Sequence, residues 1–210
     1  MKKGLSEIIC VLDRSTSMGS IIAEAKDGFK QFLETQRKEE GEAFLTVAYF
    51  DSEYDKVIDH KNLKDVDDDY IISKYTPRGM TALNDAIGNT VNDINKRLNE
   101  TEDSERPENF VFVILTDGDE NASGKFSTGK VNEIIKNQTE KFGWKFVFLA
   151  SNINAEKTAS TYGIDRKHAY NFSHTGDGVT RGMTSLACAT TSYRKGVDMN
   201  LNDMQEEKFK

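Results

Sequence analysis

The sequence predicts an α/β fold: a doubly wound, Rossmann-like sheet of six mostly parallel strands, with one antiparallel edge strand and helices on both faces. Two observations predict it. Apolar runs typical of strands buried on both faces alternate with segments of helical periodicity, which is the pattern of a parallel sheet with crossover helices. One further strand follows its predecessor within a few residues and alternates apolar with polar side chains. That pattern is typical of a hairpin at the edge of a sheet.

The first part of the chain supplies three of the predicted strands. Residues 5–13 and 43–50 are apolar runs typical of buried strands, and residues 54–60 alternate in character as an antiparallel edge strand does. Between the first two strands, residues 20–38 have the apolar spacing of a helix with one face toward the sheet. We expect residues 61–80 to form a polar connection with one short helical turn.

The remainder of the chain alternates helix and strand three times. Each predicted strand is rich in β-branched and aromatic residues, and each predicted helix has apolar residues at intervals of three or four. The predicted elements are a helix over 83–99, a strand over 109–115, a helix over 128–141, a strand over 144–150, a helix over 154–162, a weak strand over 167–172 and a helix over 179–193. We expect residues 1–198 to form a single domain and residues 199–210 to be a polar, frayed tail.

Composition narrows the classes of partner and compartment. The net charge of -7 argues against nucleic acid, because phosphate binding depends on clustered lysines and arginines. No stretch approaches the roughly 20 apolar residues of a membrane span, and no apolar signal segment precedes the first strand. We therefore expect a cytoplasmic protein that binds neither nucleic acid nor membrane. Cys10 and Cys188 lie in apolar contexts and are expected to be buried thiols.

Three segments place oxygen-bearing side chains where the predicted fold would gather them. The first strand ends in Asp13, Ser15 and Ser17, at alternating positions on one tight loop. Asp117 follows the strongest predicted strand, and Thr81 stands just before a helix. Open α/β sheets bind their ligands at the carboxyl ends of the strands, so these side chains are expected to converge. Hydroxyl and carboxylate oxygens suit a hard divalent cation.

The three segments resemble the metal-ion-dependent adhesion site of von Willebrand factor type A domains. That family carries D-x-S-x-S after the first strand, a threonine before a central helix and an aspartate after the fourth strand. The sequences Thr-Ala-Leu-Asn-Asp-Ala-Ile at 81–87 and Ile-Leu-Thr-Asp-Gly at 114–118 strengthen the resemblance, which covers roughly residues 5–198. It implies the type A fold, in a stand-alone bacterial or phage form, with a metal held by Asp13, Ser15, Ser17, Thr81 and Asp117.

The resemblance also implies a function. Neutral hydroxyls leave a bound cation with few anionic ligands, so the cation stays electrophilic and one coordination position stays open. In this family a carboxylate from an Asp or Glu side chain of a partner protein fills that position, which predicts a metal-dependent protein-binding module. The hydroxyl-rich set favours Mg²⁺, with Mn²⁺ and Ca²⁺ as alternatives.

Each of these residues has a simpler structural role as an alternative. Ser15 and Ser17 could cap the helix that begins near residue 20, and Thr81 could be only an N-cap. Asp117 precedes a glycine, and Asp-Gly is a common turn pair. We expect Asp85, one turn into the following helix, to stabilise the N-terminal end of that helix or a neighbouring loop rather than to bind metal.

Other charged residues near the three segments are predicted to lie at the rim of the site. Arg14 and Arg78 could pair with a ligand carboxylate or balance an acidic loop, and residues 119–121 are expected to be solvated loop. The histidines show no metal-ligand spacing and are expected to be surface or packing residues: His60, His168 and His174.

The sequence leaves two other functions as alternatives. A structural or assembly component, part of a multiprotein stress-response, ATPase-linked or phage system, could use the metal for self-association. A Mg²⁺-dependent hydrolase of the haloacid-dehalogenase type would also place an aspartate after its first strand, but it requires a second aspartate where this chain has Ser15. No pairing of a nucleophile with a base is evident, so we expect no catalytic residues and no enzymatic activity.

Overall fold

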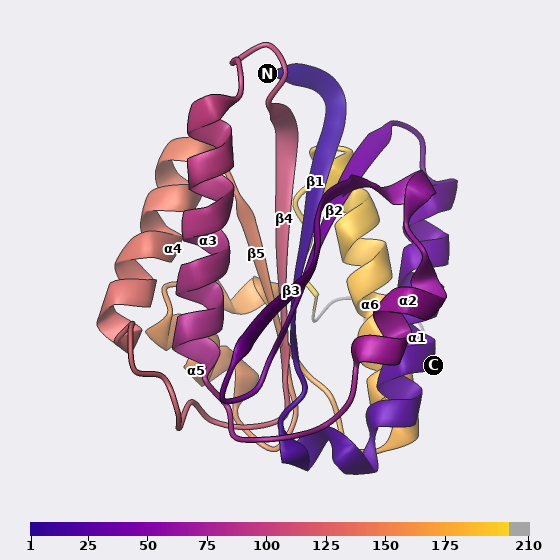
Figure 1. Cartoon of the computed structure of the whole chain (residues 1–210), viewed down its shortest axis with the longest axis vertical. Coiled ribbons are helices and arrows are strands. Elements are labelled where there is room, and N and C mark those ends of the chain that lie inside the picture. Colours follow the sequence, from indigo (N-terminus) through magenta and orange to yellow (C-terminus); the bar gives the residue numbers. More distant parts are fainter. Residues whose placement is uncertain (202–210) are drawn as a thin grey trace.

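The computed structural model describes residues 1–201, which form one six-stranded sheet with helices on both faces (Figure 1). The strand order is β3-β2-β1-β4-β5-β6, and only the β2–β3 pair is antiparallel. The predicted fold class is therefore confirmed. The strands are β1 (Lys2–Asp13), β2 (Glu42–Phe50), β3 (Tyr54–Asn62), β4 (Pro107–Thr116), β5 (Lys145–Ala150) and β6 (Ala169–Asn171).

The helices divide between the two faces of the sheet. Figure 1 shows α1, α2 and α6 on one side and α3, α4 and α5 on the other. Their bounds are α1 (Ile22–Lys38), α2 (Asp68–Lys74), α3 (Leu83–Glu100), α4 (Thr128–Phe142), α5 (Ala155–Thr161) and α6 (Gly176–Arg194), with short 3₁₀ helices η1 (Thr16–Ser20), η2 (Leu63–Asp65) and η3 (Arg166–His168). Within the described residues, no helix is long and apolar enough to cross a membrane.

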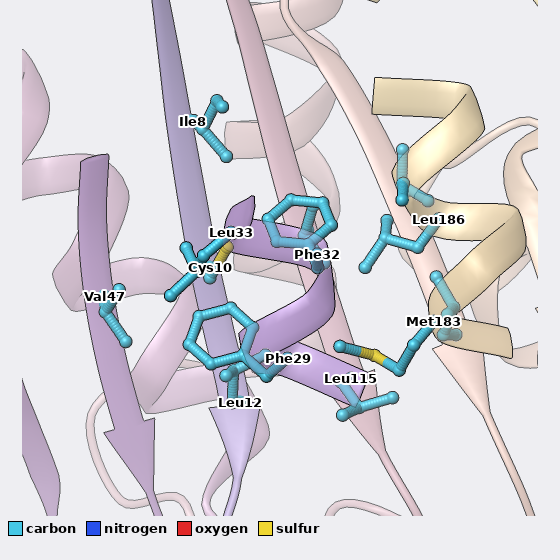
Figure 2. Packing of buried hydrophobic residues seen from close by; sticks show 14 of the residues in the cluster. Ile8, Cys10, Leu12, Phe29, Phe32, Leu33, Val47, Leu115, Met183 and Leu186 are labelled. Atoms are coloured by element: carbon cyan, nitrogen blue, oxygen red, sulfur yellow. The ribbon is translucent and has the colours of Figure 1, made fainter. Parts of the chain in front are cut away.

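Strand β1 lies at the centre of the core because it is apolar on both faces. Its even-numbered residues Ile8, Cys10 and Leu12 pack with the α1 and α6 side, and its odd-numbered residues Ile9 and Val11 pack with the α3 and α4 side. All five are fully buried. Figure 2 shows the first cluster, in which Phe29, Phe32 and Leu33 of α1 and Met183 and Leu186 of α6 close over the strand.

The connection between β3 and α3 contains more helix than expected. Residues 61–80 were predicted to hold one short turn, but η2 and the seven-residue α2 lie there. The Asp67 side chain accepts a hydrogen bond from the amide of Tyr70 and so caps the start of α2. Ile71 is fully buried, and Arg37 of α1 forms an ion pair with Asp68. The acidic run therefore holds this helix against α1.

The edge strand β3 is irregular. Its register against β2 shifts between Leu45 and Val47 and again between Val47 and Ala48. His60, within the strand, has a φ of 46°, which is unusual for a residue with a side chain. The two irregularities bend the edge of the sheet and bring the His60 ring toward β1.

A buried carboxylate lies beneath this bend. Glu7 of β1 is fully buried, and its Oε1 accepts hydrogen bonds from Arg97 Nη2 at 2.8 Å and Thr46 Oγ1 at 3.0 Å. Its Oε2 lies 2.7 Å from His60 Nδ1. This cluster joins β1, β2, β3 and α3, and no pattern in the sequence indicates it: Glu7, Thr46, His60 and Arg97.

The end of the described chain is fixed to the sheet edge. Asp198 contacts Lys167 Nζ at 2.6 Å and His168 Nε2 at 2.9 Å, and Leu201 is fully buried with its amide bonded to the Lys167 carbonyl. The predicted tail of residues 199–210 lies mostly outside the described residues, which end at Leu201.

Asp198→Asn should lower the melting temperature in a pH-dependent way. Burial alone would raise the pKa of Asp198, but hydrogen bonds from Lys167 and His168 bring it well below its usual value. A depressed folded-state pKa contributes its full stability above the unfolded pKa of about 3.9, and this contribution is lost as the pH falls from there through the lower folded pKa. The carboxylate is partly exposed, so we expect a loss of roughly 1–3 °C at pH 7. Thermal melts of both proteins at pH 7 and pH 3 should show a smaller difference at pH 3, where the carboxyl is mostly protonated in the unfolded chain but still charged in the folded one.

Candidate metal centre

The three predicted segments meet at one edge of the sheet, the lower edge in Figure 1. Strands β1 and β4 are parallel neighbours with Leu12 paired to Leu115, so Asp13 and Asp117 leave the sheet side by side. The loop before α3 reaches the same edge, where the Thr16 amide and hydroxyl both donate to the Gly79 carbonyl, at 3.2 and 2.9 Å. Adjacent strand ends and one bonded loop therefore build the site, as the topology predicts.

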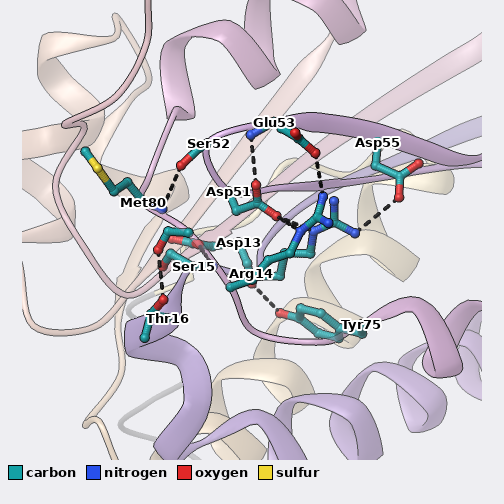
Figure 3. Close-up of polar contacts among 12 residues, drawn as sticks. Asp13, Arg14, Ser15, Thr16, Asp51, Ser52, Glu53, Asp55, Tyr75 and Met80 are labelled. Atoms are coloured by element: carbon teal, nitrogen blue, oxygen red, sulfur yellow. Dashed lines mark hydrogen bonds and ion pairs between the residues drawn. The ribbon is translucent and has the colours of Figure 1, made fainter.

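Asp13 is fully buried and fixed at both carboxylate oxygens. Its Oδ1 accepts the Ser15 amide at 2.6 Å and its Oδ2 accepts the Thr116 hydroxyl at 2.7 Å. The Tyr75 hydroxyl donates to the Asp13 carbonyl at 2.9 Å (Figure 3). Burial raises the pKa of Asp13 to about 6, although the bonds from Thr116 and Ser15 act in the opposite direction. A desolvated carboxylate of this kind is stabilised by a nearby positive charge.

Ser15, Ser17 and Asp117 form a compact group of oxygens. Ser17 Oγ donates to Asp117 Oδ1 at 2.7 Å, Ser15 Oγ lies 3.4 Å from the same oxygen, and the two hydroxyls are 3.0 Å apart. The Asp117 carboxylate is 1% exposed, and its other oxygen, Oδ2, is buried without a hydrogen-bond partner among the described residues. An unpaired buried carboxylate oxygen is costly, so this group is incomplete as it stands.

Thr81 lies close to the residue that follows Asp117. It is buried and precedes Ala82, the N-cap residue of α3. Its amide donates to Asn121 Oδ1 at 2.9 Å and its carbonyl accepts the Asn121 amide at 3.0 Å. A Cβ placed on Gly118 would lie 3.8 Å from Thr81 Oγ1, so the hydroxyl faces the residue that follows Asp117.

The donor set fits a hard divalent cation. Oxygen ligands bind Mg²⁺ at about 2.0–2.1 Å, so neighbouring corners of its octahedron lie about 3 Å apart, close to the separations among Ser15, Ser17 and Asp117. Over residues 1–201, no group of three or more His, Cys, Asp or Glu side chains is placed to hold a metal ion. The hydroxyl-rich group with the unpaired Asp117 oxygen is the candidate centre on the chemistry of its own donors.

The capping alternatives for these residues do not hold. Helix α1 begins after Ile21 rather than near residue 20, and Ser15, which precedes η1, makes no side-chain capping bond. Ala82, not Thr81, is the N-cap residue of α3. Ser15 and Thr81 therefore do not act as side-chain N-caps, and Ser17 lies within η1 rather than before α1.

A network of acidic side chains organises the loop after Asp117. Asp85 accepts the amides of Gly124, Lys125 and Phe126 at 2.8–2.9 Å, and Ser123 Oγ accepts the Asp85 amide at 2.9 Å. Asp85 therefore stabilises a neighbouring loop, as the sequence analysis expected. Glu120 continues the network by accepting the amides of Asn84, Ala122 and Ser123. Expected to be solvated loop, Glu120 and Asn121 instead join the loop to the start of α3.

Asp85→Asn is expected to destabilise the fold by about 1–2 kcal/mol in urea denaturation, because a neutral amide has one acceptor oxygen for three backbone donors. Asp119→Asn is the matched control, since Asp119 is an exposed acid in the same loop. It should leave stability unchanged. Equal effects of the two substitutions would contradict the role assigned to Asp85.

The two predicted rim arginines are held by acids rather than open to a ligand. Arg14 is buried and contacts Asp51 at 2.7 Å and Asp55 at 3.1 Å, while Arg78 contacts Asp51 at 2.8 Å and Glu53 at 2.7 Å (Figure 3). Burial raises the pKa of Asp51, but bonds from Arg78, the Glu53 amide and Arg14 bring it below its usual value. The arginines therefore balance the charge of an acidic loop, which is one of their two predicted roles, rather than being free to pair with a ligand carboxylate.

His174 lies beside the candidate centre, a position that the sequence does not predict. His174, expected at the surface or in packing, lies with Nδ1 3.9 Å from the unpaired Asp117 Oδ2. Its Nδ1 is 3.0 Å from Ser151 Oγ and its Nε2 is 2.8 Å from Ser20 Oγ. His174 follows the last parallel strand by three residues, and that position at a strand end was the available signal. By contrast, His168 is a packing residue against Tyr193, as predicted.

No protein-family model matches the chain, and no curated protein matches it either. Solved structures do match. Proximal thread matrix protein 1 from the mussel byssus, with a zinc-occupied MIDAS motif, has 21% identity and a TM-score of 0.64 over 89% of this chain and 46% of that chain. A von Willebrand factor type A structure from Catenulispora acidiphila has 10% identity and a TM-score of 0.64 over 89% of this chain and 43% of that one. The manganese-loaded TRAP protein of Plasmodium vivax has 13% identity and a TM-score of 0.58 over 87% of this chain and 73% of that one. The chain thus spans less than half of the mussel and Catenulispora chains.

Proposed function

We propose, from the von Willebrand factor type A fold that this chain has, that it is a divalent-metal-dependent protein-binding module. Its ligand is the carboxylate of an Asp or Glu side chain presented by a partner protein. The observation that carries the proposal is the meeting of the Ser15 and Ser17 hydroxyls at one oxygen of Asp117, whose other oxygen is buried without a hydrogen-bond partner among the described residues. A bound cation would stabilise such a buried carboxylate. A cation whose ligands are mostly neutral keeps positive charge, which attracts an anion from outside the chain.

The residues of the chain have separable roles in this proposal. Ser15, Ser17 and Thr81 would hold the cation through neutral hydroxyls, and Asp13 and Asp117 would bind it directly or through ordered waters. When bound, the cation supplies the positive charge that attracts a partner's carboxylate. The bonds that fix both oxygens of Asp13 keep that carboxylate in place without help from the metal.

Mg²⁺ is the metal we propose, because neutral hydroxyls and carboxylates are hard oxygen donors and Mg²⁺ is bound through few protein carboxylates. Mn²⁺ and Ca²⁺ remain alternatives. The zinc in the MIDAS motif of the mussel protein and the manganese of the Plasmodium protein support divalent-metal binding by this fold.

The surroundings of the centre support capture of an acidic side chain. The nearby arginines are neutralised by Asp51, Glu53 and Asp55, so they do not compete for the partner's carboxylate. Met80, next to Thr81, is 52% exposed, and methionine adapts its shape to varied apolar partners. We therefore expect the partner's acidic residue to lie beside an apolar side chain.

The proposal assigns no catalysis to the centre. In a hydrolase of the kind weighed above, Asp13 would be the nucleophile, but it is fully buried and both of its oxygens accept hydrogen bonds. Metal-dependent self-association is the second form of binding we retain, since an acidic residue of another copy is chemically equivalent to that of a foreign partner.

The test is retention of a partner in Mg²⁺ and its release by chelator. The immobilised chain should retain in Mg²⁺ a protein that EDTA releases, and that protein, once purified, should lose binding when one of its Asp or Glu residues is replaced by the amide. Binding that persists in EDTA, or that survives replacement of every exposed acid, would overturn the proposal. Light scattering in Mg²⁺ and in EDTA distinguishes self-association, which would appear as a metal-dependent doubling of mass.

A further inference from the structure

His174 joins four loops at the candidate metal centre. It belongs to the loop between β6 and α6, its Nε2 lies 2.8 Å from Ser20 Oγ, and its Nδ1 lies 3.0 Å from Ser151 Oγ. Ser20 ends η1, and Ser151 follows β5. The same Nδ1 faces Asp117 Oδ2 at 3.9 Å. None of the five predicted metal residues comes from the loops of Ser151 and His174.

The contact with Asp117 is the one that bears on the metal. Asp117 Oδ2 is buried and lacks a hydrogen-bond partner in the part of the chain that the structure describes, and His174 Nδ1 is an imidazole nitrogen within ion-pair distance of it. A separation of 3.9 Å exceeds a direct hydrogen bond, and a water between the two atoms can bridge it. The side chain of His174 is 22% exposed, so the loops on either side restrain the ring.

Both serine hydroxyls can donate or accept, so either neutral tautomer of His174 is compatible with them. A Nδ1–H tautomer, with Nε2 accepting from Ser20, directs its hydrogen toward Ser151 and Asp117. The Nδ1 side is the one that faces the Asp117 carboxylate.

The geometry points to His174 as a positioning residue of the metal centre, which holds the Asp117 carboxylate through its Nδ1 side. This inference rests on the proposed metal site and extends it by a residue outside the five-residue motif. Groups that orient a metal ligand from behind typically change metal affinity about 10–100-fold when they are replaced. His174 is therefore expected to affect cation affinity without being a ligand.

Two amide substitutions separate the two sides of the ring. The amide nitrogen of asparagine is as many bonds from the backbone as Nδ1, and that of glutamine is as many bonds away as Nε2. His174→Asn keeps a donor on the Asp117 side, whereas His174→Gln keeps only the Ser20 side. Ser20→Ala is the third variant, because it removes the Nε2 partner alone.

The experiment is isothermal titration calorimetry of the full chain with MgCl₂ and with MnCl₂, with melting temperatures in EDTA. We expect His174→Gln to lower both affinities about 10-fold, and His174→Asn and Ser20→Ala to remain within about 3-fold of wild type. Melting temperatures in EDTA should be the same for all four proteins, which separates positioning from folding.

Three outcomes would overturn the inference. His174→Gln could bind both metals like wild type, His174→Asn could be as weak as His174→Gln, or His174→Gln could lose Mn²⁺ affinity selectively, which would make the imidazole a direct ligand. Absence of Mg²⁺ and Mn²⁺ binding by the wild-type chain would instead refute the metal site itself, and with it the proposed function.

Discussion

Asp13→Ala is expected to reduce Mg²⁺ affinity by more than about 100-fold, to the point where calorimetry detects no binding heat. The substitution removes one of the two carboxylates of the centre. Replacing a residue that only orients a metal ligand already lowers metal affinity about 10–100-fold, so loss of a proposed ligand should lower it further. It also leaves the Ser15 amide without its carboxylate acceptor, whereas the Thr116 hydroxyl still has the Gly118 carbonyl as an acceptor. Titration of MgCl₂ into both proteins, each first stripped with EDTA, measures the difference.

Asp13→Asn is the matched control for folding. Its amide oxygen can still accept the Ser15 amide and its nitrogen can donate to the Thr116 hydroxyl, so the buried contacts keep their geometry. We expect this variant to melt in EDTA close to wild type and yet bind Mg²⁺ far more weakly, because the charge is gone. Wild-type affinity in either variant would exclude Asp13 from the metal site.

Arg97→Met is expected to lower the free energy of unfolding by about 3–5 kcal/mol, the cost of leaving a buried carboxylate without its cationic partner. Glu7 is fully buried, and Arg97 donates to it through Nη2 at 2.8 Å. Methionine fills a similar volume, so the change tests the charge rather than the packing. Urea denaturation followed by circular dichroism gives the difference.

A double variant identifies the cause of that loss. Glu7→Gln combined with Arg97→Met removes both charges, and the amide can still pair with Thr46 and His60. We expect it to recover most of the stability lost in the single variant. If Arg97→Met lowers the free energy of unfolding by less than about 1 kcal/mol, the Glu7–Arg97 pair contributes no more than an exposed ion pair does, and the prediction is wrong.

The fold was predictable because its strands are strongly apolar. β1 and β4 are buried on both faces, and a continuous run such as Phe110–Leu115 is compatible with few other arrangements. The elements that differ from the prediction are short and depend on a few side-chain contacts. Helix α2 is held by the Asp67 cap and by the Arg37–Asp68 pair, and strand β6 is only three residues long, because η3 occupies Arg166–His168.

The places of the five proposed metal residues in the fold could be expected from the sequence, because each follows a strand or precedes a helix. The structure brings Asp13, Ser15, Ser17 and Asp117 into one hydrogen-bonded group and places Thr81 beside Gly118. The supporting contacts were not predictable, since they join side chains across loops whose relative positions only the folded sheet defines. His174 is the clearest example, because its partners Ser20 and Ser151 are far away in the sequence.

The bent edge of the sheet also restricts how this protein can meet others. A straight, unpaired strand edge presents a row of amides and carbonyls that recruits a foreign strand, with aggregation as the common result. Here the β3 edge has two register shifts and a left-handed residue at His60, and the β6 edge offers only three residues. Both edges are therefore poor templates for strand addition, and a partner is more readily met by the loops at the carboxyl ends of the strands.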